Sequence, residues 1–197
     1  MANRSDRELV DAAREGDTEA FSALVRRHQK RIYRLAVHLL RNAAEADDVT
    51  QDTFVRAYGA LDRFDGRSEP FTWMYRIAVN LSLNSIRARK ARRLATTTDD
   101  PKVAGDLVER RPTHADPAAR SADRELAAAL EQALDELSET LRTTLVLVCV
   151  DGLSHAEAAA VLGAPEGTIA WRVHEARKKL RASLERRGYA EGWSEPP

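Results

Sequence analysis

Apolar residues recur every three or four positions along much of this chain, which is the spacing of amphipathic helices. The longest regular run predicts a helix over 18–41, with apolar positions at Phe21, Leu24, Val25, Ile32, Leu35, Ala36, Leu39 and Leu40. The same spacing, with polar residues at the helix starts, predicts helices over 5–15, 42–60 and 70–93. These four helices indicate an N-terminal helical domain at residues 1–94.

The helical pattern is lost over 95–122, where proline, glycine, threonine and aspartate are frequent, and a flexible linker is predicted there. It resumes over 123–187, with one apolar stripe made of Leu126, Leu130, Leu134 and Leu137. Residues 188–197 predict a flexible tail, in which Trp193 is either loose or docked; the sequence leaves both open. The predicted fold class is all-α, with two small helical domains joined by a flexible linker and a helix-turn-helix in the second domain.

The segment 153–180, LSHAEAAAVLGAPEGTIAWRVHEARKKL, predicts two helices joined by a tight turn. Ser154 and Glu157 form a capping box for the first helix, and Gly163 stands where a C-cap glycine would end it. Pro165 suits the first turn of the second helix, which is basic. Such a helix-turn-helix places its second helix in a DNA major groove. An ordinary helical hairpin is the alternative, but it would not need the basic charge.

Charged residues balance overall, with 31 Lys and Arg against 31 Asp and Glu, but they are segregated along the chain. Residues 42–65 contain six acids and two arginines, whereas residues 71–94 contain six basic residues and no acid. Either run alone is better explained as a solvated helix face. Together, separate acidic and basic faces suit a protein that contacts both another protein and nucleic acid.

No enzyme motif is evident in the sequence. It contains no phosphate-binding glycine loop and no nucleophile elbow, and its five histidines lack metal-ligand spacing. We therefore expect no enzymatic activity, no metal and no cofactor. The polar N-terminus lacks a signal-peptide core, and no apolar run is long enough to cross a bilayer, so a cytoplasmic protein without membrane insertion is predicted. The single cysteine, Cys149, fits a reducing compartment and is expected in the core.

Three segments in this order, 44–64, 70–93 and 153–180, resemble the polymerase-binding, promoter-melting and upstream-element-binding segments of a bacterial RNA polymerase sigma factor. The small size and the missing middle domain resemble the extracytoplasmic-function (ECF) type, group IV of the sigma-70 superfamily. The resemblance covers nearly the whole chain apart from the linker and the tail. It implies that residues 1–94 are sigma region two and that residues 123–187 are sigma region four.

The resemblance implies that the helix over 42–60 binds the clamp helices of the large polymerase subunits. Its candidate contact residues are Asp47, Asp48, Gln51, Asp52 and Phe54. Independently, Asp48 and Asp52 stand four apart on one helix face, where like charges repel unless a basic partner neutralises them. A favourable carboxylate cluster near a helix N-terminus is the alternative, and it explains Asp48 but not Asp52.

The basic helix over 70–93 predicts contacts to promoter DNA. The resemblance places Asn80 and the loop around Phe64 at a flipped base of the minus-ten element, and an asparagine can donate and accept at a base edge. Promoter opening also needs phosphate contacts, for which the candidates are Arg76, Arg87, Arg89 and Lys90. Trp73 lies at a core-facing position. Strands would separate by capture of unpaired bases, because no nucleotide-hydrolysing motif is present.

The second helix of the helix-turn-helix is expected to read the minus-thirty-five element. The candidate contacts are His155, Thr168, Ala170, Trp171, Arg172, His174, Glu175 and Arg177. Ile169 and Val173 face inward by their spacing, which turns Trp171 outward. Many family members carry Arg or Lys near Ala170 and Glu175, so the resemblance does not transfer an upstream sequence. Trp171 suits a thymine methyl, and Glu175 either accepts from a cytosine amine or repels phosphate.

The predicted function is an alternative sigma factor that binds core RNA polymerase, through its clamp helices and flap, and directs initiation at specific promoters. An anti-sigma factor is expected as a further partner. The alternative is a stand-alone helix-turn-helix regulator with a helical sensor domain, which would explain only the C-terminal half. A helical adaptor that binds only proteins would not need the basic run over 172–181.

Overall fold

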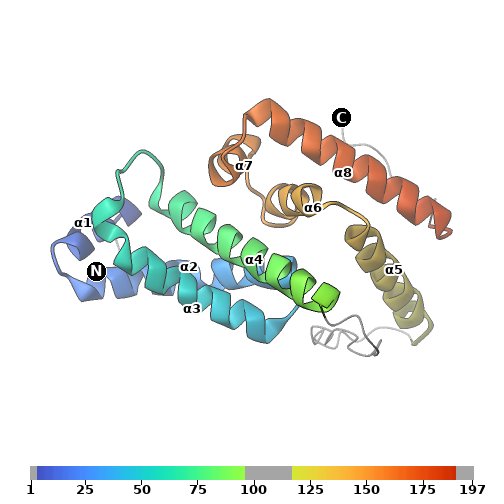
Figure 1. The fold of residues 1–197 in the computed structure, drawn as a ribbon, viewed down its shortest axis with the longest axis horizontal. Coiled ribbons are helices and arrows are strands. Elements are labelled where there is room, and N and C mark those ends of the chain that lie inside the picture. Colours follow the sequence, from blue (N-terminus) through green and yellow to red (C-terminus); the bar gives the residue numbers. More distant parts are fainter. Residues whose placement is uncertain (1–3, 96–116, 190–197) are drawn as a thin grey trace. The chain divides into compact units, whose positions relative to one another are not determined.

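The computed structural model describes residues 4–95 and 117–189, and every regular element in these ranges is a helix (Figure 1). The chain divides into two compact units. The first contains α1 to α4, and the second contains α5, α6, η2, α8 and the greater part of α7. The predicted all-α fold with two helical units is therefore confirmed. Most of the predicted linker, and the tail with Trp193, lie outside the described residues.

The helices of the N-terminal unit begin at well-defined caps. They are α1 (Asp6–Arg14), α2 (Thr18–Leu40), α3 (Ala43–Gly59), the 3-10 turn η1 (Leu61–Arg63) and α4 (Pro70–Ala95). The side chains of Ser5, Asp17 and Asn42 each accept a hydrogen bond from a backbone N–H in the first turn of α1, α2 and α3. Arg41 has a left-handed φ of 55°, which ends α2 and lets α3 begin two residues later.

Helix α2 forms the centre of this unit, because it packs against α1, α3 and α4. Its fully buried side chains include Leu24, Ile32, Leu35, Leu39 and Leu40. Helix α4 contributes Tyr75 to the same interior, and the Tyr75 hydroxyl donates a hydrogen bond to the carbonyl oxygen of Arg31 (3.5 Å). Since α3 and α4 each use one face for this core, their opposite faces remain available for binding.

Helix α1 is held on the unit by polar contacts that the sequence pattern did not predict. Asp6 lies 2.7 Å from Nε2 of the buried His28 and also forms an ion pair with Arg27. Arg7 forms an ion pair with Glu69, in the loop before α4, at 2.8 Å. Burial lowers the pKa of His28, and the neighbouring Asp6 carboxylate only partly offsets this. The neutral imidazole can then donate its Nε2 hydrogen to Asp6.

The lowered pKa of His28 predicts that this unit loses stability on mild acidification. The unfolded chain takes up a proton near the ordinary value of about 6.5, whereas the folded unit resists protonation until a lower pH. The stabilisation is therefore complete above about pH 6.5 and is lost as the pH falls through the folded-state pKa. Urea unfolding between about pH 7.5 and 5.5 should show a shallower loss of stability in His28→Gln than in the native chain. Parallel pH dependences of the two proteins would contradict this assignment.

The C-terminal unit carries the helix-turn-helix. Its elements are α5 (Pro117–Asp135), α6 (Glu139–Leu145), the π-helical turn η2 (Val146–Val150), α7 (His155–Leu162) and α8 (Glu166–Arg186). The predicted capping box is present, since the Ser154 hydroxyl accepts from the Glu157 N–H (3.2 Å) and the Glu157 carboxylate accepts from the Ser154 N–H (2.8 Å). Gly163 has a φ of 61° and ends α7 as predicted. Helix α5 begins at Pro117, inside the predicted linker, because proline is well tolerated at a first helical position.

The apolar stripe of α5 is only partly buried. Helix α5 packs on α8 through the small residues Ala129 and Ala133, with Leu134 and Leu137 beside them, whereas Leu126 and Leu130 are exposed. The expectation that Cys149 lies in the core is wrong. Cys149 is exposed rather than buried. It lies in the π-helical turn, whose wider hydrogen-bonding pattern shifts the phase of the residues that follow.

Candidate functional site

The outer face of α3 is acidic and partly apolar. Asp47, Asp48, Gln51 and Asp52 are all exposed, as the sequence predicts. No ion pair joins the three aspartates to any residue that the structure describes. Val55 follows one turn later with 69% of its surface exposed, and the exposed Tyr58 packs edge-on against Phe21 of α2, at 5.0 Å between ring centroids. We name Asp48, Gln51, Asp52, Val55 and Tyr58 the α3 outer face.

Phe54 differs from the other predicted contact residues of α3. Only 7% of its surface is exposed, and it shares the inner face of the helix with Val49, Thr53 and Ala57. A side chain in this position packs in the core and supports the outer face from beneath. Helical spacing indicates this position. Val55 lies seven residues after Asp48 and so on the same face, whereas the neighbouring Phe54 is turned about 100° away from it.

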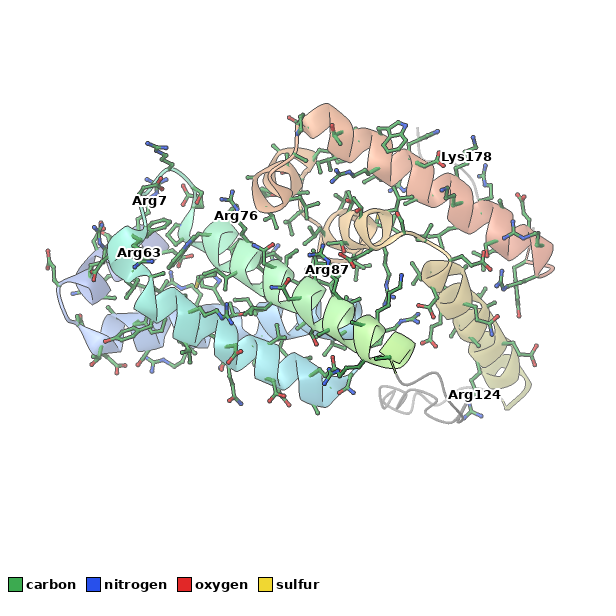
Figure 2. All side chains as sticks on the ribbon, viewed as in Figure 1. Arg7, Arg63, Arg76, Arg87, Arg124 and Lys178 are labelled. Atoms are coloured by element: carbon green, nitrogen blue, oxygen red, sulfur yellow. The ribbon has the colours of Figure 1, made fainter. Side chains whose placement is uncertain are left out.

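Helix α4 presents a polar stripe along its exposed side. Arg76, Asn80, Asn84 and Arg87 follow one another at intervals of three or four residues, and all four are exposed. Figure 2 shows Arg76 and Arg87 on this helix. We name these four residues the α4 stripe. It contains no carboxylate, and it adds Asn84, which the sequence analysis did not select.

Arg89 and Phe64 do not join the α4 stripe. The Arg89 guanidinium lies 3.4 Å from the Glu45 carboxylate and 3.3 Å from the carbonyl oxygen of Leu40, and the Ser85 hydroxyl donates to Glu45 at 2.9 Å. These contacts fasten α4 to the start of α3, so Arg89 positions the helices. Phe64 is buried against Trp73, at 4.9 Å between ring centroids, so the loop around it is held by an aromatic core contact. Lys90 is exposed, as predicted.

Helix α8 has the phase that its sequence predicts. Ile169, Val173 and Ala176 are buried, and Trp171 has 60% of its surface exposed. Thr168 and Arg172 are half-buried beside this outer face. Lys178 lies two turns beyond Trp171 on α8 (Figure 2). A large exposed aromatic residue on the second turn of a recognition helix is well placed to contact base edges.

The other predicted contact residues of α8 divide into two groups. Ala170, His174 and Arg177 are exposed, but they line a groove that is also lined by residues of α5 and η2, and His155 lines the same groove from α7. Glu175 is half-buried and lies 3.6 Å from Lys179, its i, i+4 partner. The sequence leaves two roles open for Glu175, a contact to a cytosine amine or repulsion of phosphate. The ion pair with Lys179 offsets the negative charge of this carboxylate.

The described residues contain no group of three or more His, Cys, Asp and Glu side chains placed to hold a metal ion. Within the same residues, no helix is both long and apolar enough to span a membrane.

Two helical units, one with an acidic face and a basic stripe and one with a helix-turn-helix, define a DNA-binding protein that also contacts another protein. Comparisons with known proteins agree with this class. The model for Sigma-70 region 2 matches residues 24–92, and the model for Sigma-70, region 4 matches residues 127–180.

Curated relatives match over almost their whole length. The chain is 35% identical over 190 residues to the RNA polymerase sigma-H factor of Pseudomonas aeruginosa, which covers 94% of this chain and 96% of the relative. It is 34% identical over 180 residues to the ECF RNA polymerase sigma factor SigW of Bacillus subtilis, covering 89% and 94%. The chain therefore belongs to the ECF sigma factors of the sigma-70 family, and the predicted family is confirmed.

Solved structures show the same architecture. The structure of CnrH, solved in complex with the cytosolic domain of CnrY, superposes with a TM-score of 0.66 at 32% identity and covers 93% of this chain and 99% of CnrH. The sigma factor RpoE from Bartonella quintana shares the fold, with a TM-score of 0.63 at 24% identity, covering 84% of this chain and 96% of RpoE. Because both units match, the alternative of a stand-alone regulator loses its support. The protein is a sigma factor, which binds core RNA polymerase and directs initiation at promoters.

Proposed function

We propose that the two units divide the work of a sigma factor as the sequence predicts. The unit within residues 1–94 binds the polymerase clamp through the α3 outer face, and it captures the minus-ten element with the α4 stripe. The unit within residues 123–187 binds the minus-thirty-five element with the outer face of α8 and the polymerase flap with another surface. The observation that carries this proposal is the separation of an acidic, partly apolar face on α3 from a carboxylate-free stripe on α4.

The α4 stripe supplies the two kinds of contact that promoter capture needs. Arg76 and Arg87 supply positive charge for the DNA backbone, whereas Asn80 and Asn84 supply paired donors and acceptors for base edges. Opening the duplex in this way depends on binding unpaired bases and consumes no nucleotide. The protein therefore contributes promoter choice and strand capture, and catalysis belongs to the polymerase.

Regulation by an anti-sigma factor in the cytoplasm completes the proposal. CnrH, the similar structure with 32% identity, was solved with the cytosolic domain of a second protein bound to it. A protein partner that covers the α3 outer face would exclude the polymerase, because both would compete for the same exposed aspartates and Val55.

In-vitro transcription with purified core polymerase tests the proposed function. The protein alone should support initiation from a cognate promoter selected from a random library, with no second sigma factor present. A chain that changes transcription only when another sigma factor is added would overturn the proposal and restore the stand-alone regulator.

A further inference from the structure

Helix α2 carries a basic face that none of the contacts proposed above uses. Residues 20–41 hold six Lys or Arg and no Asp or Glu. Within this run Lys30, Arg34 and His38 recur every four residues, so they share one face of the helix, and all three are exposed. This face is turned away from the buried Ile32 and Leu39. We name Lys30, Arg34 and His38 the α2 stripe.

The charges of the α2 stripe are not neutralised within the described part of the chain. Arg26 and Arg27, earlier on the helix, are ion-paired, but no hydrogen bond or ion pair joins the stripe side chains to any residue that the structure describes. Positive charge is favourable in the last turn of a helix, which explains His38 but not Lys30 and Arg34. Lys30 and Arg34 stand four residues apart, where like charges repel, so this pair is suited to an anionic partner.

The α2 stripe borders the edge at which α2 meets α4. The Arg31 guanidinium stacks on the Phe71 ring near the start of α4, at 4.2 Å from the ring centroid. The carbonyl oxygen of Leu40, at the end of α2, accepts from Arg89 near the end of α4 (3.3 Å). Helices α2 and α4 therefore run side by side in the same direction. At about 100° per residue, Arg31 is turned only about 60° away from Arg34, so the stripe follows this shared edge.

The backbone of a nucleic acid is the partner that fits this surface. Successive residues of the α2 stripe lie about 6 Å apart along the helix axis, and a row of cations without carboxylates is suited to the phosphates of one strand. A protein interface is instead centred on apolar and aromatic side chains. The exposed large apolar side chains of the described residues all lie outside α2. The stripe therefore offers charge without an apolar centre.

We propose that the α2 stripe binds phosphates of the same DNA strand whose unpaired bases the α4 stripe captures. The inference rests on the proposed function of α4 and extends its DNA-binding surface onto a second helix. The α4 stripe offers amides to base edges, whereas Lys30 and Arg34 offer only charge, so they hold the captured strand without selecting its sequence. A strand held in this way is less available to re-form the duplex, which stabilises the open complex.

The double variant Lys30→Gln with Arg34→Gln tests the proposal in holoenzyme reconstituted with core polymerase. The probe is a fluorescent single-stranded oligonucleotide that carries the minus-ten sequence of the cognate promoter, titrated at several salt concentrations. Loss of two phosphate contacts should reduce the slope of log affinity against log salt concentration by about 1.4 and lower the affinity roughly tenfold at about 0.15 M salt.

Two control variants should bind the strand as the native holoenzyme does. The first is the charge-preserving pair Lys30→Arg with Arg34→Lys. The second is Arg14→Gln, which removes an exposed charge from α1. Circular dichroism of each variant verifies that the helices are intact. When uncharged methylphosphonate linkages replace the contacted phosphates, found by scanning the strand, the native protein and the double glutamine variant should bind equally.

Three outcomes would overturn the proposal. Equal affinity and equal salt slope in the native holoenzyme and the double glutamine variant would overturn this inference alone. A loss of binding to core polymerase, with binding to the strand unchanged, would identify a protein as the partner of the α2 stripe. A native holoenzyme that does not bind the strand would overturn the proposed function of α4 together with this inference.

Discussion

Charge reversal at Asp48 or Asp52 should weaken binding to core RNA polymerase by roughly 2–5 kcal/mol, the range measured when one member of a close interfacial charge pair is removed. Both carboxylates are exposed on α3, and neither forms an ion pair within the described part of the chain. They lie on the same helix face as the exposed Val55, within two turns before it, so a partner that covers Val55 also desolvates them. A fluorescence titration of labelled protein with core polymerase measures the loss.

Asp52→Arg should slightly stabilise the free protein, which separates a binding defect from a folding defect. Asp48 and Asp52 are an i, i+4 pair of like charges that repel each other. Asp52→Arg converts this repulsion into an attraction between Asp48 and the new arginine, with the acid on the favourable N-terminal side. A gain of roughly 0.2–0.5 kcal/mol is expected for the helix. Glu15→Arg, an exposed charge reversal just after α1, is the matched control and should bind polymerase normally. Undiminished polymerase binding by a folded Asp48→Arg, Asp52→Arg double variant would falsify the assignment of this face.

The helices were predictable because their sequence signals are local. The capping residues Ser5, Asn42 and Ser154, and Gly163 at the end of α7, determine helix ends through bonds made within a few residues of each. The apolar spacing of α2 and α8 likewise predicts which face of each helix is buried, without reference to tertiary contacts. The exposed position of Trp171 followed from the same phase, whereas Asn80 was selected from the family resemblance.

Features that depend on a distant contact were not predicted. The sequence suggests Arg89 as a phosphate contact, which stays a prediction, but it does not indicate the ion pair of Arg89 with Glu45, which lies 44 residues earlier. Leu126 and Leu130 have the spacing of a core stripe, but Ala129 and Ala133 allow the closer approach of α8 and take the interior. The exposure of Cys149 depends on a π-helical turn, for which the sequence offers no simple signal. The periodicity of a single sequence does not indicate which residues far apart in the chain will contact each other.

Base selection should divide between the two units, and Asn80→Ala should affect only the downstream element. The Asn80 side chain is exposed on the α4 stripe, where its amide can pair with a base edge. Its loss should relax selection at one downstream position by roughly 1–3 kcal/mol and reduce open-complex formation. Transcription from a randomised promoter library, with permanganate detection of unpaired thymines, measures both effects. Asn84→Ala, one turn along the same stripe, is the comparison and should not change that position.

Trp171→Ala should weaken recognition of the upstream element by roughly 1–3 kcal/mol and leave downstream selection intact. Trp171 has 60% of its surface exposed and does not line the groove, so its truncation leaves the core of the unit unchanged. Lys178→Ala, two turns further along, should instead weaken binding to all DNA sequences alike. It should also reduce the slope of log affinity against log salt concentration by about one. The same promoter library distinguishes the two patterns. If Trp171→Ala altered only the downstream preference, α8 would not be the helix that binds the upstream element.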